Sequence, residues 1–142
     1  MRSTRQRGFS FLEMLIVVTI MALLMVVAIP AYKDMVMHTQ ETAAMQAIRT
    51  LHTAQMQCFS QNNRYAASLR ELGGKWVAAD LALGEKGGYK FRLDDSPTGY
   101  TIHAEPVKFG VNGKRAFYSD ETMILRQHEG PEPATAESEE AK

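Results

Sequence analysis

Glu13 is the residue whose position points most clearly to chemistry. It stands at the start of an apolar run, Met14 to Ala31, that contains eighteen residues and no charge. A carboxylate so close to the hydrocarbon of a membrane is costly, so Glu13 is expected to have a partner of opposite charge. The alternative is that Glu13 reaches out to the polar headgroups and has no further role.

The segments on either side of Glu13 indicate a membrane anchor. The apolar run is close to the roughly twenty residues that a helix needs to cross a bilayer. Arg2, Arg5 and Arg7 precede the run, and positive charge there keeps that end of the chain in the cytoplasm. We therefore expect a single-pass membrane protein with a cytoplasmic N-terminus and the rest of the chain outside. A simple anchor for a periplasmic domain is one interpretation of this pattern.

Residues 7–33 together resemble the N-terminus of the type IV prepilins. That family has a short basic leader ending in Gly, an aromatic or apolar residue after it, a Glu as the fifth residue after the leader, and an apolar stretch containing a Pro. The matching residues here are Gly8, Phe9, Glu13 and Pro30. The stretch from Asn63 to Leu72 also resembles a segment of the pseudopilins of type II secretion systems. The resemblance is therefore to the type IV pilin and pseudopilin family as a whole.

Three features depart from the family pattern. Phe11 stands where Leu is common, and no Gly precedes Pro30 in the apolar stretch. The two C-terminal cysteines that close a loop in many type IV pilins are absent. Cys58 is the single cysteine of the chain, so an intramolecular disulfide is excluded. Its place on a helical stripe favours the role of a small buried apolar residue.

The resemblance implies how residues 8–13 are used. A prepilin peptidase would cut after Gly8, where the missing side chain lets the backbone enter the enzyme, and Phe9 would then be N-methylated. The methylated amine keeps its positive charge. Glu13 lies one helical turn, about 6 Å, beyond Phe9. The amine of a neighbouring subunit would be its stronger partner, because two opposite charges buried together cost far less than either alone. Glu13 would then set the axial register of subunits during assembly.

The sequence predicts one long helix from Phe9 to about Gln61. Pro30 is the one strong helix breaker in this stretch, and because it removes a backbone hydrogen bond we expect a kink there. Residues 9–32 are apolar all round and form the transmembrane or filament-core half, whereas residues 33–61 form an amphipathic half. Apolar residues recur at three-and-four spacing in this second half, and this stripe is expected to pack on a globular head. The stripe consists of Met37, Ala44, Ala47, Leu51, Ala54 and Cys58.

The rest of the chain predicts a small head and a tail. Residues 62–129 contain four alternating stretches separated by turns, which is typical of an antiparallel meander. These stretches are residues 89–93, 100–104, 115–118 and 122–126. Residues 130–142 contain two prolines and four glutamates and are expected to be disordered. The predicted fold is therefore α+β: a long N-terminal helical spine packed on a small antiparallel β-sheet of about four strands, the pilin fold.

Composition and spacing argue against catalysis and against bound cofactors. Sixteen Lys and Arg balance sixteen Asp and Glu, so bulk charge gives no reason to expect a nucleic-acid partner. No nucleophile–base pair, phosphate loop or zinc spacing stands out. His38 and His52 share a helix face but lie about 21 Å apart, too far to share one metal ion. We predict a protein that is not an enzyme, without catalytic residues, cofactor or metal site.

The expected function follows from the resemblance. The first hypothesis is a structural subunit of a type IV pilus, assembled from the inner membrane into a helical filament for motility, adhesion or uptake. Its partners would be copies of itself, the prepilin peptidase and methyltransferase, and an inner-membrane assembly platform with its ATPase. The alternative is a pseudopilin of a type II secretion system, ending in a periplasmic pseudopilus. A weaker alternative is a membrane-anchored periplasmic binding module or enzyme.

Overall fold

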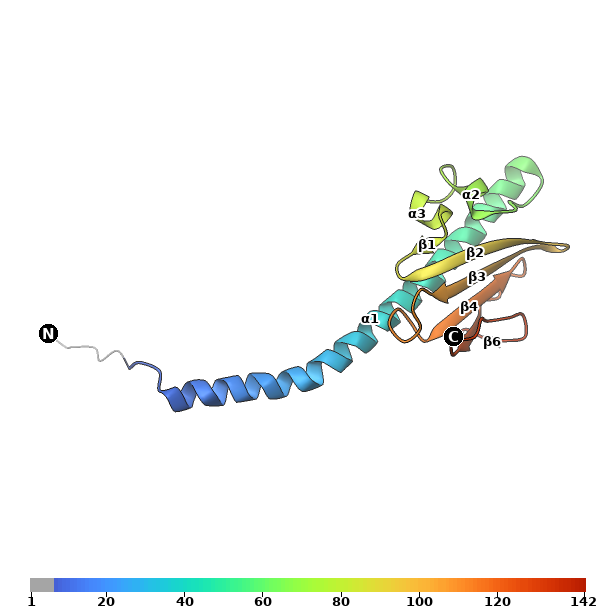
Figure 1. The fold of residues 1–142 in the computed structure, drawn as a ribbon. Coiled ribbons are helices and arrows are strands. Elements are labelled where there is room, and N and C mark those ends of the chain that lie inside the picture. Colours follow the sequence, from blue (N-terminus) through green and yellow to red (C-terminus); the bar gives the residue numbers. More distant parts are fainter. Residues whose placement is uncertain (1–6) are drawn as a thin grey trace. The chain divides into compact units, whose positions relative to one another are not determined.

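The computed structural model describes residues 7–142 and begins with one long helix (Figure 1). Helix α1 runs from Phe11 to Asn62 and contains 52 residues. Most of the predicted leader, residues 1–6, lies outside the described residues. The described chain forms two compact units, one ending at Met35 and one running from Val36 to Lys142. The boundary falls inside α1, three residues beyond the predicted end of its apolar half.

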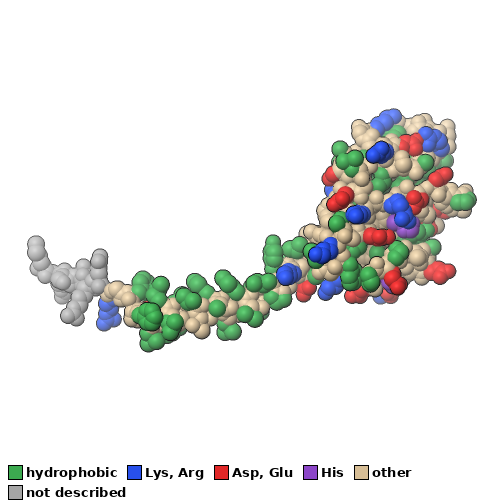
Figure 2. Space-filling model, in the orientation of Figure 1, with side chains coloured by type: hydrophobic (Ala, Val, Ile, Leu, Met, Phe, Trp, Pro, Cys, Tyr) green, Lys and Arg blue, Asp and Glu red, His purple; other side chains and the backbone are tan. Residues whose placement is uncertain are grey.

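The first half of α1 has no covering layer within its own unit. Every side chain from residue 11 to residue 35 is exposed (Figure 2). Pro30 lies inside the helix, which continues on both sides of it. Its missing N–H leaves the carbonyl of Val26 without the usual helical donor. The kink at Pro30 stays a prediction that follows from this missing bond.

The second half of α1 carries the stripe that the sequence predicts. All six stripe residues are buried, together with Ile48. Two polar residues of α1, Glu41 and Gln55, are buried as well. Gln55 forms two hydrogen bonds with the backbone of Ala66, at 3.0 Å and 2.8 Å. Glu41 accepts from the backbone N–H of Lys114 and from the guanidinium of Arg115, both at 2.8 Å. These hydrogen bonds offset the free-energy cost of burying the two polar side chains. Helical periodicity does not reveal such partners.

Two short helices follow α1. Helix α2 covers Leu69–Leu72, and Ser68 caps it by accepting a hydrogen bond from the backbone N–H of Glu71. Helix α3 covers Ala79–Ala82. Gly73 lies close to the side chain of Ala82, and a Cβ at this position would come within 2.6 Å of it. The absence of a side chain at Gly73 therefore lets the two helices approach each other.

The rest of the head is one antiparallel sheet whose six strands follow chain order. The strands are β1 (Glu85–Lys86), β2 (Tyr89–Ser96), β3 (Gly99–Pro106), β4 (Arg115–Asp120), β5 (Arg126–Glu129) and β6 (Glu139–Glu140). The α+β pilin fold is thus confirmed, with six strands where about four were predicted. The fourth predicted strand, residues 122–126, was misplaced. Asp120 accepts hydrogen bonds from the backbone N–H groups of Thr122 and Met123, so these residues turn, and the strand begins at Arg126.

One face of the sheet closes the core against α1. Side chains alternate along β2 and β3, and the inward set is buried. Six aromatic and aliphatic residues make up this set: Tyr89, Phe91, Leu93, Tyr100, Ile102 and Ala104. They form one continuous apolar cluster with the α1 stripe from Ala44 to Cys58 and with Leu69, Leu72 and Leu81 of the short helices. The alanines of the stripe leave room for the sheet to approach the helix closely.

The prediction that residues 130–142 are disordered was wrong. Ala134 is buried and packs with Ala116 and Tyr118 on the outer face of the sheet. Strand β6 pairs with β5, and Arg126 donates a hydrogen bond to the carbonyl of Ser138 at 2.9 Å. Composition alone suggested disorder, because a segment rich in Glu and Pro lacks the apolar area for a core of its own. The segment needs no core of its own, because it packs on the outer face of the sheet and pairs with β5.

His52 connects α1 to the sheet through a buried chain of hydrogen bonds. Its Nδ1 lies 2.7 Å from the hydroxyl of Tyr100, and its Nε2 lies 2.7 Å from Oγ of Ser119. The Ser119 hydroxyl donates to the carbonyl of Ile124, so it accepts from an Nε2–H of His52. Nδ1 is then the acceptor for Tyr100. This arrangement is satisfied by neutral His52, and burial lowers the pKa of the imidazole below its ordinary value of 6.5.

The hydrogen bonds of neutral His52 predict that the head is less stable in mild acid. The unfolded chain protonates His52 near pH 6.5, whereas the folded head does so only at lower pH. The stabilisation is therefore complete above about pH 6.5 and is lost as the pH falls through the folded-state pKa. Chemical unfolding of residues 36–142 between about pH 7.5 and pH 5.5 should show a falling free energy of unfolding. His103, whose pKa is also lowered by burial, adds to the same slope.

Two variants separate the contribution of His52 from the rest of the pH slope. His52→Gln should reduce the pH slope, and His38→Gln, at an exposed position on the same helix, should leave it unchanged. An unchanged slope in His52→Gln would remove His52 as its source.

Candidate functional site

The segment around Gly8 and Glu13 is exposed and ends in a capped helix start. Gly8 and Phe9 precede α1, and the side chain of Phe9 is 81% exposed. Ser10 caps the helix, because its hydroxyl accepts from the N–H of Glu13 at 3.2 Å and its carbonyl accepts from Met14. The backbone between Gly8 and Phe9 therefore lies outside the helical hydrogen-bond ladder.

Sequence reasoning missed this cap and placed the helix start at Phe9, two residues early. The signal was present, because Ser10 and Glu13 have the Ser-x-x-Glu spacing of a capping box. Glu13 occupies the first turn of α1, where the helix dipole favours negative charge. Its side chain points into the surroundings of the helix rather than into its own unit.

The apolar half of α1 is the largest apolar surface of the described chain. Its large apolar side chains are between 43% and 86% exposed from Phe11 to Tyr32. An 18-residue window of α1 has a mean hydropathy of 2.8, and none of the window is buried. A helix that is apolar on every side must be surrounded by lipid or by other protein. By length and composition, α1 is the one helix among the described residues that could cross a membrane.

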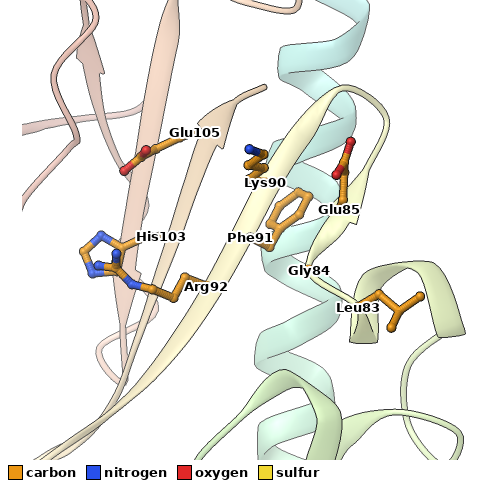
Figure 3. Close-up of a pocket in the computed structure, with 8 residues that line it drawn as sticks. All are labelled: Leu83, Gly84, Glu85, Lys90, Phe91, Arg92, His103 and Glu105. Carbon is orange, nitrogen blue, oxygen red and sulfur yellow. The ribbon is translucent and has the colours of Figure 1, made fainter. Parts of the chain in front are cut away.

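The head carries a groove of about 450 Å³ on the outer face of β2 and β3 (Figure 3). Cross-strand neighbours line it in two pairs, Lys90 with Glu105 and Arg92 with His103. Leu83, Gly84 and Glu85 form the opposite wall. Two cations, Lys90 and Arg92, and two carboxylates, Glu85 and Glu105, therefore line the groove. Their charges balance, so the groove has no net charge that would favour a charged ligand.

One imidazole nitrogen in this groove stands out. His103 Nδ1 is buried and has no hydrogen-bond partner within residues 7–142. Burial, followed by the nearby positive charge of Arg92, lowers the pKa of His103. Arg92 itself donates to Asp94 at 2.6 Å. The imidazole is thus held neutral, and the groove combines no nucleophile with this base.

A charged surface that shares Glu85, Lys90 and Arg92 with the groove lies along residues 64–92, which also include α2 and α3. This segment contains six Lys and Arg against three Asp and Glu. Arg64 forms an ion pair with Glu71, and the ammonium group of Lys75 lies 4.6 Å from the ring centre of Trp76. Figure 2 shows several Lys and Arg side chains on the part of the head where these helices lie. The surface is locally basic, although residues 36–142 contain twelve basic and fourteen acidic side chains.

Residues with metal-binding side chains are dispersed over the described chain. Between residues 7 and 142, no three His, Cys, Asp or Glu side chains come together in a way that could hold a metal ion. Cys58 is fully buried, and both ring nitrogens of His52 form hydrogen bonds, one with Tyr100 and one with Ser119.

Two family models match the chain. Residues 30–116 match the family described as type IV minor pilin ComP, DNA uptake sequence receptor. Residues 3–29 match the prokaryotic N-terminal methylation motif. The first match covers the amphipathic half of α1 and the head as far as β4, and the second covers the segment with Gly8, Phe9 and Glu13. The two matches meet at Pro30.

Curated relatives share part of this sequence. The chain is 35% identical over 69 residues to the type IV major pilin protein PilA of Myxococcus xanthus, covering 49% of this chain and 31% of PilA. It is 43% identical over 49 residues to a fimbrial protein of Pseudomonas aeruginosa, covering 34% and 32% of the two chains. It is 24% identical over 115 residues to the type IV major pilin protein PilE1 of Neisseria gonorrhoeae, covering 80% and 62%. The chain thus spans about a third of the length of the first two relatives.

The match of residues 3–29 to the N-terminal methylation motif, with Gly8 and Phe9 exposed, predicts a defined mature N-terminus. Mass spectrometry of the protein from cells that process it should find a chain that starts at Phe9 and carries one N-methyl group. Gly8→Val should block this cut, because the added side chain would keep the backbone out of the peptidase. Detection of mature chains that begin beyond Ala31 would instead indicate removal of the apolar run as a secretory signal.

Proposed function

Because the chain belongs to the type IV pilin family, we propose that it is a subunit of a pilus filament that waits in the inner membrane before assembly. As a pilin it is a structural protein and not an enzyme. The observation that carries the proposal is the fully exposed apolar half of α1 with Glu13 at its start. Lipid would surround this half before assembly, and the same half of other subunits would surround it in the filament.

Exchange of lipid for protein keeps the free-energy cost of assembly low. The apolar side chains of residues 14–31 stay out of water in both states, so the hydrophobic effect does not oppose the transfer. In water, by contrast, each Å² of exposed apolar area would cost about 25 cal/mol. The subunit should therefore pass directly from membrane to filament, and the work of extraction would come from an assembly platform and its ATPase.

Glu13 would fix the position of each subunit along the filament. Cleavage after Gly8 would leave a methylated, positively charged amine on Phe9. The carboxylate of Glu13 in one subunit would pair with this amine in the next. In an apolar filament core an unpaired carboxylate is strongly unfavourable, so subunits that are shifted along the axis would be rejected. The exposed side chains of Phe9 and Glu13 leave both groups accessible to a neighbour.

The comparisons favour a pilus over a secretion pseudopilus. The relatives described above are named as pilins or fimbrial proteins, and the model that matches the head is that of a minor pilin. A minor subunit, present in fewer copies than the main pilin, fits this match. A pilin partner for filament growth would then be a second chain with the same N-terminal segment.

Glu13→Ala should leave membrane insertion intact and reduce incorporation into filaments. Removing one member of a buried ion pair costs on the order of 3–5 kcal/mol, so we expect a loss of at least about tenfold. Immunoblots of sheared filaments and of membrane fractions measure the two quantities. Asp34→Ala removes a carboxylate of α1 beyond the apolar run and should incorporate normally. Equal incorporation of Glu13→Ala and the unaltered chain would exclude the register role.

DNA reception at the pilus is a second candidate function. It is favoured by the family match over residues 30–116, which includes most of the head. The balanced charge of the whole chain gave no reason to expect this partner, because it hides the local excess of cations in residues 64–92. Lys and Arg side chains bind DNA by displacing the counterions of its phosphates. Arg70 and Lys75 are exposed in this segment, and the half-buried Trp76 lies beside Lys75.

The double variant Arg70→Ala with Lys75→Ala tests this surface. If both cations contact phosphates, the slope of log K against log salt for duplex DNA should become shallower by about 2. Fluorescence anisotropy with the full chain in detergent measures this slope. The matched control, Lys108→Ala with Lys142→Ala, removes two exposed lysines outside the segment and should preserve it. Equal effects of both double variants would indicate non-specific attraction of DNA to positive charge.

A further inference from the structure

The loop between β3 and β4, residues 107–114, is an exposed apolar surface that filament assembly through α1 leaves unexplained. Val107, Phe109 and Val111 are 41%, 46% and 55% exposed. Lys108 and Lys114 are its charged residues, and the loop contains no Asp or Glu. Large apolar side chains that are exposed together commonly mark a site of interaction with another protein or with a membrane.

Hydrogen bonds hold this loop against α1. Asn112 donates to the side chain of Gln40 at 3.3 Å, and the backbone N–H of Lys114 donates to Glu41 at 2.8 Å. Inside the loop, the N–H of Gly110 donates to the carbonyl of Gly113 at 2.9 Å. Figure 1 shows the loop, in orange, beside α1 at one end of the sheet. The position of the loop is therefore fixed relative to residues 40–41.

This anchor lies close to the end of the apolar run along the same helix. Lys33 is the first charged residue after the run. Burial of α1 by the head begins at Met37, four residues or about 6 Å later. Gln40 follows at about 10 Å from Lys33. The headgroup layer of one leaflet is about 5–8 Å thick. Only a few residues thus separate the apolar run from the end of the head that carries the loop, so this end can reach the headgroups when the run spans a bilayer.

We propose that residues 107–111 form a membrane foot, which inserts Val107, Phe109 and Val111 into the outer headgroup layer while the subunit waits for assembly. This rests on the membrane-anchored state described under the proposed function. Aromatic and aliphatic side chains are suited to this layer, and the long stem of Lys108 lets its ammonium group reach water or phosphate. The carboxylates of Glu105 and Glu129 lie on the strands and not in the loop, so the sheet stays outside the lipid.

The foot gives the head a fixed orientation on the membrane. A head held only by α1 could rotate about the helix axis, whereas insertion at a second point restricts this rotation. The groups that the assembly machinery must contact would then be presented in one orientation. On extraction the loop leaves the lipid together with the apolar half of α1.

Tryptophan quenching by brominated lipids tests the foot. The full chain with Trp76→Phe is placed in vesicles of phosphatidylethanolamine and phosphatidylglycerol that contain brominated acyl chains. A single tryptophan is then introduced as Phe109→Trp, Phe59→Trp or Val26→Trp. Phe59 is the matched control, because it is 45% exposed and lies 18 residues, about 27 Å, beyond Glu41 on α1. Val26→Trp reports on the membrane-spanning half.

The expected result is strong quenching for Val26→Trp and quenching of Phe109→Trp that is several-fold greater than that of Phe59→Trp. Val111→Trp, at a site that is 55% exposed, should behave like Phe109→Trp and keeps the test open if the first variant fails to fold. Equal, weak quenching of Phe109→Trp and Phe59→Trp, with Val26→Trp strongly quenched, would overturn the foot but leave the anchor. Weak quenching of Val26→Trp would overturn the anchor, and the foot with it.

Discussion

The structure depends on one unmet requirement: the apolar half of α1 has no covering layer in its own unit. Residues 11–35 are exposed on every side of the helix. No arrangement of a single helix can bury its own surface, so lipid or other chains must complete the unit. The carboxylate of Glu13 sharpens this requirement, because its location in an apolar surrounding calls for a positive partner as well as for apolar contacts.

The head solves the opposite problem, since a small sheet must be held on a helix that extends beyond it. The apolar stripe supplies the contact area, and three polar residues of α1 fix the position. Glu41 binds the start of β4, His52 binds Tyr100 and Ser119, and Gln55 binds the segment after the helix. Apolar contact is tolerant of small shifts along the helix, whereas each buried hydrogen bond is satisfied in one register only. Glu41 also holds the loop 107–114, because it accepts from the backbone N–H of Lys114.

The residues 130–142 illustrate how a segment can be ordered without a core of its own. Within this segment, Ala134 is buried in the apolar cluster on the outer face of the sheet. There it packs against Ala116 and Tyr118 of β4. Other contacts of this segment are the backbone hydrogen bonds of β6 with β5 and of Ala141 with the carbonyl of Leu125, and the hydrogen bond from the Arg126 side chain to the carbonyl of Ser138. The strand β5 thereby gains a neighbour along its open edge. A covered edge is less available for pairing with other chains.

The sequence by itself determined the long helix, its apolar and amphipathic halves and the buried stripe from Met37 to Cys58. It also determined the alternation of β2 and β3, and the motif around Gly8, Phe9 and Glu13. These features depend on the spacing of residues along one element, which composition and periodicity record directly. The roles of Glu41, His52 and Gln55, the course of residues 130–142, and the anchored loop 107–114 were decided only by the tertiary structure. Each depends on a partner far away in the chain, such as Arg115 for Glu41 or Tyr118 for Ala134, and no local pattern specifies which distant group will complete a hydrogen bond or cover an apolar side chain.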